Sequence, residues 1–446
     1  MEVQIISKEN VKPASPTPEH LRFFKISLFD QLIIFPYASR IYFYPPTNVL
    51  DTHNKVEVLQ KSLSKTLSHF YPLAGKIKDH LSIECNDEGA YFVQARINCR
   101  LQDFLTKPDL VFLRRFLPWD GVVSAEYPVE GIHVCNIQVT VFECGGIAIA
   151  MCLSHKFIDC VSNTTFLKAW TAAACGFAEA PRPNFIAYAS DFFIPARDSW
   201  LQDLRRMWGS FAKKGKCITR RFLFNATAVA TLKSQATGEK VEVPTPVEAV
   251  SAFLWKCSMA ASKARHGFQR PALCVHVVDL RGRIPLPPAQ MENSVGNLFW
   301  IAAADCSEDC SDLHDLVGKL REAASKIDGD FVKKIRGEEG NSFNSEYFRG
   351  ITELNSRDGN DCFYFVNWCK TDLYGTDFGW GKPVWVSNVG MKGSDEVRNF
   401  CIVNETRSGD GVEAWLTLDE QVMAILERDP ELPSLASLDL SPLAMD

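Results

Sequence analysis

The feature that most constrains the fold is a mixture of strand-like and helix-like segments on both sides of one irregular stretch. Residues near Ala180 to Lys216 are rich in proline and charge, and they read as a crossover between two halves. Both halves mix β-rich apolar runs with amphipathic helical segments. A chain of 446 residues is long enough for two or three domains. The sequence therefore predicts a mixed α+β protein built from two similar-sized parts.

Charge and hydropathy exclude several classes of partner. The net charge is −6, from 48 Lys and Arg against 54 Asp and Glu, and the two signs are interspersed. A nucleic-acid binder needs a basic stripe, so we expect no nucleic-acid partner. The densest basic stretch fits a solvated linker better than a phosphate site, and it comprises Lys213, Lys214, Lys216, Arg220 and Arg221. No run of about eighteen uncharged apolar residues is present, so we expect no membrane span.

The 15 cysteines form no Cys-x-x-Cys pair and no zinc-binding set. Many lie in apolar runs, where a thiol behaves as a small hydrophobic group. We therefore expect free thiols, no metal, no bound cofactor and a reducing compartment. Met1 to Pro18 lacks an apolar signal core, which favours a cytoplasmic location.

One histidine stands where a catalytic base could be held. The apolar strand-like run Ile147 to Leu153 leads into Ser154-His155, and a helix is predicted from about Val161 to Ala174. A strand-to-helix corner exposes a side chain while fixing its backbone, and an imidazole that titrates near neutrality suits proton abstraction from an alcohol. From the spacing alone, the pattern fits a hydrogen-bonded core histidine as well as it fits a catalytic base. Asp159 fits a helix-capping role better than a His-Asp relay.

A second motif is the glycine-rich run from Tyr374 to Pro383, which contains Asp377-Phe378-Gly379-Trp380-Gly381. Glycines allow tight turns, and Asp377 would seek a cation or a backbone N–H partner. A kinase would also need a glycine-rich phosphate loop and a His-Arg-Asp loop, and both are missing. From the residues alone, a structural loop is the simplest reading.

Together, in this order and at this distance, the two motifs resemble those of the BAHD acyl-CoA-dependent acyltransferases of plants. Supporting pieces extend the resemblance over nearly the whole chain: Ser27-Leu28-Phe29-Asp30, His69 to Gly75, Asp279 to Arg283 and Gly296-Asn297. The first of these and the lead-in from Val3 to Pro18 are most similar to the branch that acetylates alkaloid and terpenoid alcohols. At one place the pattern differs, because Cys160 stands where the family usually has glycine or alanine. We expect a local packing change there without loss of activity.

The resemblance implies two chloramphenicol-acetyltransferase-like domains, with mixed sheets flanked by helices and a solvent channel between them. We place the domains at 1–195 and 221–446 and the linker at 196–220, and the segment at about 370–395 could pack on the first domain. His155 would lie in the middle of the channel. Asp159 is implied to pair with an arginine, and Asp377 with Arg281 or Arg283. Asp159, Asp377, Gly379, Trp380 and Gly381 would then be structural.

The activity that the resemblance implies is acyl transfer, with acetyl favoured, from acyl-CoA to a hydroxyl of a plant specialised metabolite. A polycyclic alkaloid is the favoured acceptor, and the protein is expected to be a monomer. His155 would take the hydroxyl proton directly, since no Gly-x-Ser-x-Gly motif supplies a nucleophile for an acyl-enzyme. We expect a backbone carbonyl to hold its other ring nitrogen. The Trp380 indole or a water would stabilise the oxyanion.

The sequence identifies residues that would bind the two substrates less clearly than it identifies the candidate base. On the CoA side, the predicted helix from Thr245 to Lys263 carries Ser251, Trp255 and Lys256, and Ser387 would lie near the pantetheine arm. A solvated surface lysine is an equal reading for Lys256. Candidate acceptor aromatics are Phe35, Tyr37, Phe299 and Trp300, and each fits core or wall at least as well. Amine N-acylation and a catalytically inactive CoA- or alkaloid-binding paralogue remain alternatives.

Overall fold

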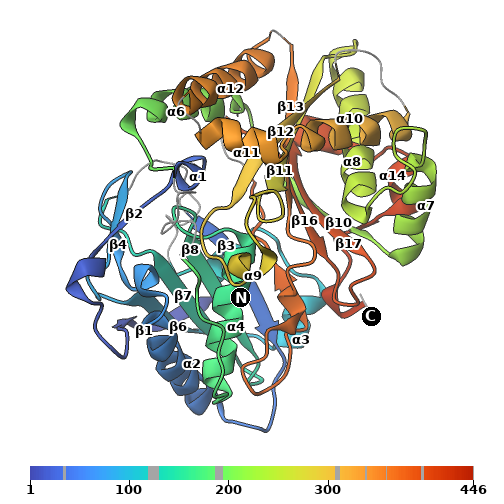
Figure 1. Ribbon diagram of the computed structural model, residues 1–446. Helices are drawn as coiled ribbons and strands as arrows, with labels where there is room; N and C mark the ends of the chain where they lie inside the picture. The colour runs from blue at the N-terminus through green and yellow to red at the C-terminus, as the bar shows by residue number, and fades with distance from the viewer. Residues whose placement is uncertain are drawn as a thin grey trace.

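Two sheet-rich domains flanked by helices make up the protein (Figure 1). The computed structural model describes residues 1–33, 37–118, 130–185, 194–306, 312–336, 339–357, 359–392 and 396–444. The expected α+β class is confirmed. Among the described residues, no helix has the length and apolar character needed to cross a membrane.

The first domain is built on a mixed sheet in the order β1-β6-β7-β8-β3-β14. Its strands are β1 (Val3–Val11), β6 (Ala90–Ile97), β7 (Cys135–Phe142), β8 (Ile147–Ser154), β3 (Tyr37–Tyr44) and β14 (Trp385–Ser387). The β-rich runs on either side of Gly145-Gly146 predict a hairpin, and β7 and β8 form it; Gly145 in its turn has φ +82°, a conformation that favours glycine.

Helices and one small sheet complete this half, and a second small sheet is formed by residues beyond position 195. The helices are α1 (Leu28–Gln31), α2 (Thr52–Leu67), α3 (Leu101–Thr106) and α4 (Cys160–Ala174). β2 (Phe23–Lys25), β5 (Ser82–Glu84) and β4 (Lys76–Ile77) form one small sheet, and β9 (Lys213–Lys214) pairs with β15 (Glu396–Val397). α2 and α4 pack on each other and share one apolar core with the sheet, in which Leu59, Leu63 and Trp170 are fully buried.

The sequence from Leu81 to Ile97 predicts two strands joined by a turn at Asn86 to Gly89, and both strands form, but they do not pair with each other as a hairpin. β5 pairs with β2 and β4, whereas β6 pairs with β1 and β7 in the main sheet. Asp87 and Gly89, both with positive φ, turn the chain from one sheet to the other. Alternating hydrophobicity marks a strand but does not identify its partner.

The second domain has a mixed sheet in the order β12-β11-β13-β16-β17-β10-β18. Its strands are β12 (Phe299–Cys306), β11 (Ala272–Asp279), β13 (Asp361–Asn367), β16 (Asn399–Glu405), β17 (Val412–Asp419), β10 (Cys217–Phe224) and β18 (Ser437–Leu438). Its helices are α6 (Asp198–Ser210), α7 (Ala226–Ala236), α8 (Pro246–His266), α9 (Pro288–Met291), α10 (Leu313–Ser325), α11 (Gly329–Arg336), α12 (Gly340–Asn355), α13 (Glu420–Leu426) and α14 (Glu431–Leu435). α8 begins at a capping box between Thr245 and Glu248, as its sequence suggests.

Two segments join the two halves of the chain, and the second lies within the stretch at about 370–395 for which the resemblance implies packing on the first domain. The stretch predicted as an irregular crossover contains α6, which packs against α12 and buries Trp200 and Trp208. β14 comes from the second half of the chain yet pairs antiparallel with β3 of the first sheet, with Trp385 opposite Phe43. The first sheet therefore contains one strand from the second half of the chain.

Candidate active site

His155 lies directly after β8, before α4 begins. Every residue of β8 is buried, and Ser154 is paired with Tyr37 of β3. The backbone that carries the imidazole is thus fixed by the sheet on one side and by the capped helix on the other.

The imidazole is held by Asn297, a fully buried residue 142 positions away in the sequence. Its Nδ1 lies 3.1 Å from Asn297 Oδ1. Asn297 Nδ2 donates to the backbone oxygen of His155 at 2.7 Å, which fixes the orientation of the amide. Nδ1 must then carry the proton, leaving the Nε2 lone pair available as a base. The expected backbone carbonyl is wrong, because a side-chain amide takes that position.

Asp30 holds Asn297 in place. Its Oδ1 accepts Nδ2 of Asn297 at 2.8 Å, and its Oδ2 accepts the backbone N–H and the hydroxyl of Ser27 at 2.7 and 2.8 Å. Burial raises the pKa of this fully buried carboxyl, and the hydrogen bonds from Ser27 and Asn297 oppose that rise. Asp30 and Asn297 belong to motifs that support the family resemblance, but the residues alone assign them no role.

The state of His155 suits a general base. Burial lowers its pKa below the ordinary value of 6.5, while Asp159 and Asn297 act in the opposite direction. The imidazole is therefore neutral at pH 7 and able to accept a proton. Phe299 lies edge-on to the ring, with ring centroids 6.1 Å apart.

Asp159 is structural, as predicted. It is the N-cap of α4, with Oδ1 accepting the Ser162 N–H at 2.8 Å. Arg281 binds it in a bidentate manner at 2.8 and 3.0 Å, and the Leu298 N–H donates at 3.1 Å. Although burial acts to raise its pKa, Arg281 holds the pKa of Asp159 below the usual value. The pairing of Asp159 with an arginine is confirmed, and it joins the two halves beside His155.

The implied pairing of Asp377 with Arg281 or Arg283 is wrong. Asp377 Oδ1 accepts the backbone N–H groups of Gly379 and Gly381 at 2.8 and 2.9 Å. Arg281 is occupied by Asp159, and Arg283 donates to the backbone oxygens of Ala324 and Ile327. Gly379 and Gly381 have φ of +99° and +105°, so the carboxylate stabilises a turn that needs glycine.

Trp380 lies far from His155, so its indole is not the oxyanion donor. It stacks on Phe378 and packs against Tyr44, with ring centroids 5.6 and 6.5 Å away. Tyr44 is paired with Ile147 at the start of β8, whereas His155 follows the other end of that strand. At roughly 3.3 Å per residue, about 25 Å of strand separates the two positions. Trp380 anchors the loop in the apolar core of the first domain.

The four residues assigned to CoA fall on two different elements. Ser251 and Trp255 are fully buried on α8, and Ser387 is fully buried on β14. Each keeps a side-chain polar atom without a hydrogen-bond partner in the described structure. Lys256 forms an ion pair with Glu431 at 2.9 Å, which favours a structural role. The solvent channel and the CoA contacts remain predictions.

The four aromatic residues predicted to bind the acceptor also lie in different places. Phe299 and Trp300 alternate along β12, so their side chains point to opposite faces of the sheet. Phe299 faces His155, whereas Trp300 packs against Phe331 and Phe348 in the core of the second domain. Tyr37 is buried, and its hydroxyl donates to the His133 backbone oxygen at 2.6 Å. Phe35 lies outside the described residues.

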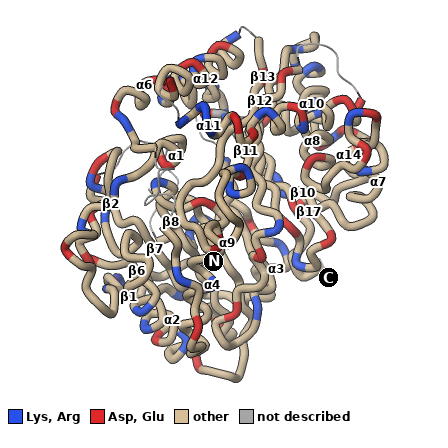
Figure 2. Tube along the Cα trace, viewed as in Figure 1, with Lys and Arg blue, Asp and Glu red and all other residues tan. Residues whose placement is uncertain are grey.

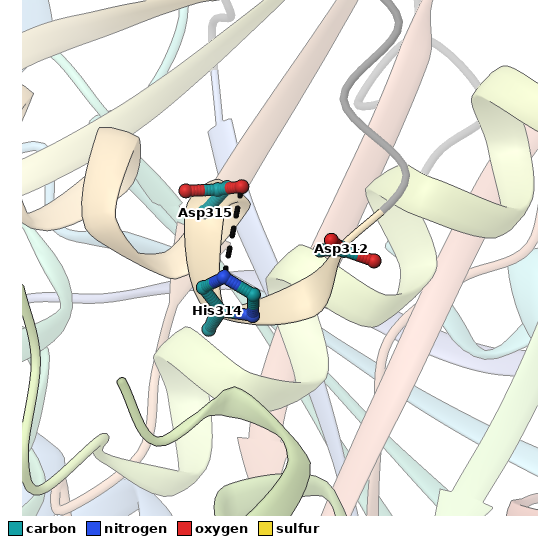
Figure 3. Close-up of side chains that lie close together, drawn as sticks. All are labelled: Asp312, His314 and Asp315. Atoms are coloured by element: carbon teal, nitrogen blue, oxygen red, sulfur yellow. Dashed lines mark ion pairs between the residues drawn. The ribbon is translucent and has the colours of Figure 1, made fainter. Parts of the chain in front are cut away.

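In the part of the chain that the structure describes, the group of potential metal ligands lies near the start of α10 and not beside His155. Lys and Arg are interspersed with Asp and Glu over both domains in Figure 2. Asp312, His314 and Asp315 lie close together near the start of α10 (Figure 3), where His314 Nε2 lies 3.7 Å from a carboxylate oxygen of Asp315. These groups are exposed or half-exposed, and Lys240 lies 4.0 Å from Asp315. The cysteines in the described ranges are free thiols.

Comparisons with known proteins agree over the whole chain. A family model described as the Transferase family matches residues 1–433. Epi-neemfruitin B 7-O-acetyltransferase of Melia azedarach is 41% identical, and limonoid 7-O-acetyltransferase of Citrus sinensis is 42% identical, each over 99% of this chain and 100% of the relative. Vinorine synthase of Rauvolfia serpentina is 36% identical over 99% of both chains. Its crystal structure matches with a TM-score of 0.79 and 33% identity, covering 98% of this chain and 99% of that one.

Proposed function

Because the chain belongs to the BAHD family of acyl-CoA-dependent acyltransferases, we propose that it transfers an acetyl group from acetyl-CoA to a hydroxyl of a polycyclic plant metabolite. The observation that carries this proposal is the neutral His155, whose Nδ1 is held by Asn297 so that Nε2 is left as the base.

The proposed mechanism uses His155 twice. Nε2 takes the proton of the acceptor hydroxyl, and the oxygen attacks the thioester carbonyl of acetyl-CoA. The tetrahedral intermediate then breaks the carbon–sulfur bond, and His155 returns the proton to the departing CoA thiolate. Asn297 and Asp30 keep the ring in one tautomer throughout, because Asn297 Oδ1 can only accept a hydrogen bond.

For the acceptor, we propose a neutral polycyclic alcohol of the limonoid type. This rests on the two relatives above 40% identity, one described as an epi-neemfruitin B 7-O-acetyltransferase and the other as a limonoid 7-O-acetyltransferase. An alkaloid alcohol is the second candidate, favoured by the similarity to vinorine synthase in sequence and structure. The free thiols of the described cysteines support a reducing compartment, and we propose the cytosol.

The test is acyl transfer by the purified protein with acetyl-CoA and a panel of limonoid, other terpenoid, alkaloid and amine acceptors. Thiol release and product mass are followed for the wild type and for His155→Ala, with His314→Ala as an exposed histidine control. We expect a mass gain of one acetyl group on a hydroxyl, lost in His155→Ala and kept in His314→Ala.

Other outcomes separate the alternatives. Transfer from malonyl-CoA or an aromatic acyl-CoA alone would keep the mechanism and change the donor. Acylation of amines alone would favour N-acyl transfer. A folded protein that binds CoA and transfers no acyl group to any acceptor would instead be a binding protein.

A further inference from the structure

Arg40 places a guanidinium in the interior without a carboxylate partner. The residue lies on β3 and is 3% exposed. Its guanidinium stacks on the Trp368 ring at 3.7 Å, and Nη2 makes one long hydrogen bond, 3.4 Å, to Asn404 Oδ1. Nε has no hydrogen-bond partner, and no ion pair forms within 4.0 Å among the residues that the structure describes.

Other buried arginines in this protein are neutralised. Arg281 is bidentate to Asp159, and Arg221 donates to Glu413 at 2.9 Å. Among the described residues, Glu413 is the carboxylate that raises the pKa of Arg40, but it is held by Arg221 and by Trp415 Nε1, the latter at 2.6 Å. Burial lowers the pKa of Arg40 to about 10. A buried charge that serves stability alone would be paired, because an unpaired one costs several kcal/mol of solvation, roughly.

Two more buried polar groups accompany it. Tyr42 shares a face of β3 with Arg40, and Asn163 lies in the first turn of α4. Burial raises the pKa of the Tyr42 hydroxyl, and the nearby Asn163 side chain opposes that rise. Neither that hydroxyl nor Asn163 Oδ1 makes a well-formed hydrogen bond in the described ranges, and both residues are at most 4% exposed. We call Arg40, Tyr42 and Asn163 the Arg40 cluster.

The Arg40 cluster lies beside the turn that carries His155. Arg40 is three residues from Tyr37, which pairs with Ser154, the neighbour of His155. Arg40 and the Cys160 thiol are near enough to influence each other's pKa, and Cys160 directly follows Asp159. Trp368 and Asn404 cover the guanidinium from the second half of the chain. The cluster therefore places a buried positive charge with few hydrogen bonds where the two halves of the chain meet.

We propose that Arg40 is a specificity-determining residue that binds a carbonyl or carboxylate oxygen of a bound substrate and disfavours acceptors with a protonated amine. This inference rests on the acyl transfer proposed above. A guanidinium offers donors to such an oxygen, while a second buried cation nearby is repelled in the low-dielectric interior. The oxygen belongs to the acceptor or to the acyl group, and the two sources are distinguishable.

The experiment compares kcat/KM for the wild type, Arg40→Met, which keeps the length without the charge, and Arg40→Lys. Neutral polycyclic alcohols with a carbonyl group are set against alkaloid alcohols protonated at the assay pH, with acetyl-CoA in both series. We expect Arg40→Met to lower the ratio of neutral to cationic acceptor turnover at least tenfold and Arg40→Lys to lower it less. Asn404→Ala, which removes only the long hydrogen bond, should leave the ratio unchanged.

The donor arm repeats the series with malonyl-CoA. If Arg40 binds an oxygen of the acyl group, Arg40→Met loses malonyl transfer and keeps acetyl transfer to every acceptor. If Arg40 binds an oxygen of the acceptor, Arg40→Met loses transfer to acceptors with a carbonyl group, whichever donor is used. Equal loss with all donors and acceptors, together with a lower Tm, would mean that Arg40 only joins the domains, and would overturn the proposal.

A binding measurement separates this inference from the proposed function. Calorimetric titration of the same acceptors into His155→Ala, with and without Arg40→Met, needs no turnover. If acyl transfer fails for every substrate but binding still discriminates by charge through Arg40, the proposed function is wrong and the role of Arg40 stands. If both variants bind neutral and cationic ligands alike, the role of Arg40 is wrong.

Discussion

At the scale of single residues, the chemistry depends on a pair that is remote in sequence. His155 gains its tautomer from Asn297, and Asn297 gains its orientation from Asp30. The hydrogen bond between Asn297 and Asp30 is buried, so water does not compete for it, whereas the one between His155 and Asn297 is part-buried. Asn297 and Asp30 therefore act as positioning residues for the base.

The pH profile follows from the lowered pKa of His155. A general base works in its neutral form, and the pKa of this group lies below 6.5 in the folded protein. Activity should therefore be level through pH 7 to about 8 and fall only as the pH drops below 6.5. The measurement is kcat/KM against pH at fixed ionic strength. An acid limb centred at pH 7 or above would contradict this assignment.

Removing the positioning amide should damage turnover more than binding. We expect Asn297→Ala to lower kcat on the order of 10- to 100-fold with little change in KM, because it removes the group that orients the His155 ring. The apparent pKa of the acid limb should also fall, because Asn297 raises the pKa of His155. Asn355→Ala is the matched control, since it removes a buried amide that bonds Ser210 instead. An unchanged acid limb would show that Asn297 has only a packing role.

At the scale of elements, α4 is held by its cap. Asp159 satisfies the first turn of the helix and neutralises the buried Arg281. Asp159→Ala should cost about 3–5 kcal/mol, because it removes the buried bidentate partner of Arg281 and leaves the exposed Asp279 as its ion-pair partner. The depressed pKa of Asp159 adds stability at neutral pH that is lost as the pH falls through that pKa.

The measurement is denaturant unfolding of Asp159→Ala, Arg281→Met and the double variant. The double variant should recover part of the loss, because it removes both charges. If the two single costs simply add, the ion pair does not couple the residues.

Elements also show what the sequence could and could not predict. His155, Asp159 and Asp377 stand in local motifs, and the strand, the helix cap and the glycine turn beside them follow from residues a few positions apart. Asn297 could not be assigned, because its contact with His155 depends on how the start of β12 approaches α4 in three dimensions. The predicted pairing of Asp377 with an arginine is wrong because its carboxylate already accepts two backbone N–H groups from its own loop. The partners of β5 and β6 could not be predicted correctly, because tertiary packing, and not the sequence of a strand, decides which strand it pairs with.

At the scale of the whole molecule, the two domains should unfold together. Trp385 of β14 is fully buried, stacking on Phe43 of the first sheet and on Trp415 of β17, with centroids 5.2 and 6.1 Å away. Calorimetry of the wild type should give one two-state transition. Trp385→Ala should lower stability by about 3–5 kcal/mol and separate the transition into two.

Trp255→Ala is the matched control for that prediction. Trp255 is equally buried but lies on α8 within the second domain. This variant should lower Tm while keeping a single transition. Two transitions in the wild type would show that the shared strand does not couple the domains.

The pairing of β3 with β14 also matters while the protein is being made. β3 ends at Tyr44 and its neighbour begins at Trp385, so about 340 residues are synthesised before that edge can be covered. At roughly 5–20 residues per second, the edge stays open for on the order of 20 to 70 seconds on the ribosome. An uncovered strand of this kind is a template for pairing between nascent chains. Recombinant yield should therefore depend on chaperone supply and translation speed as well as on the stability of the finished fold.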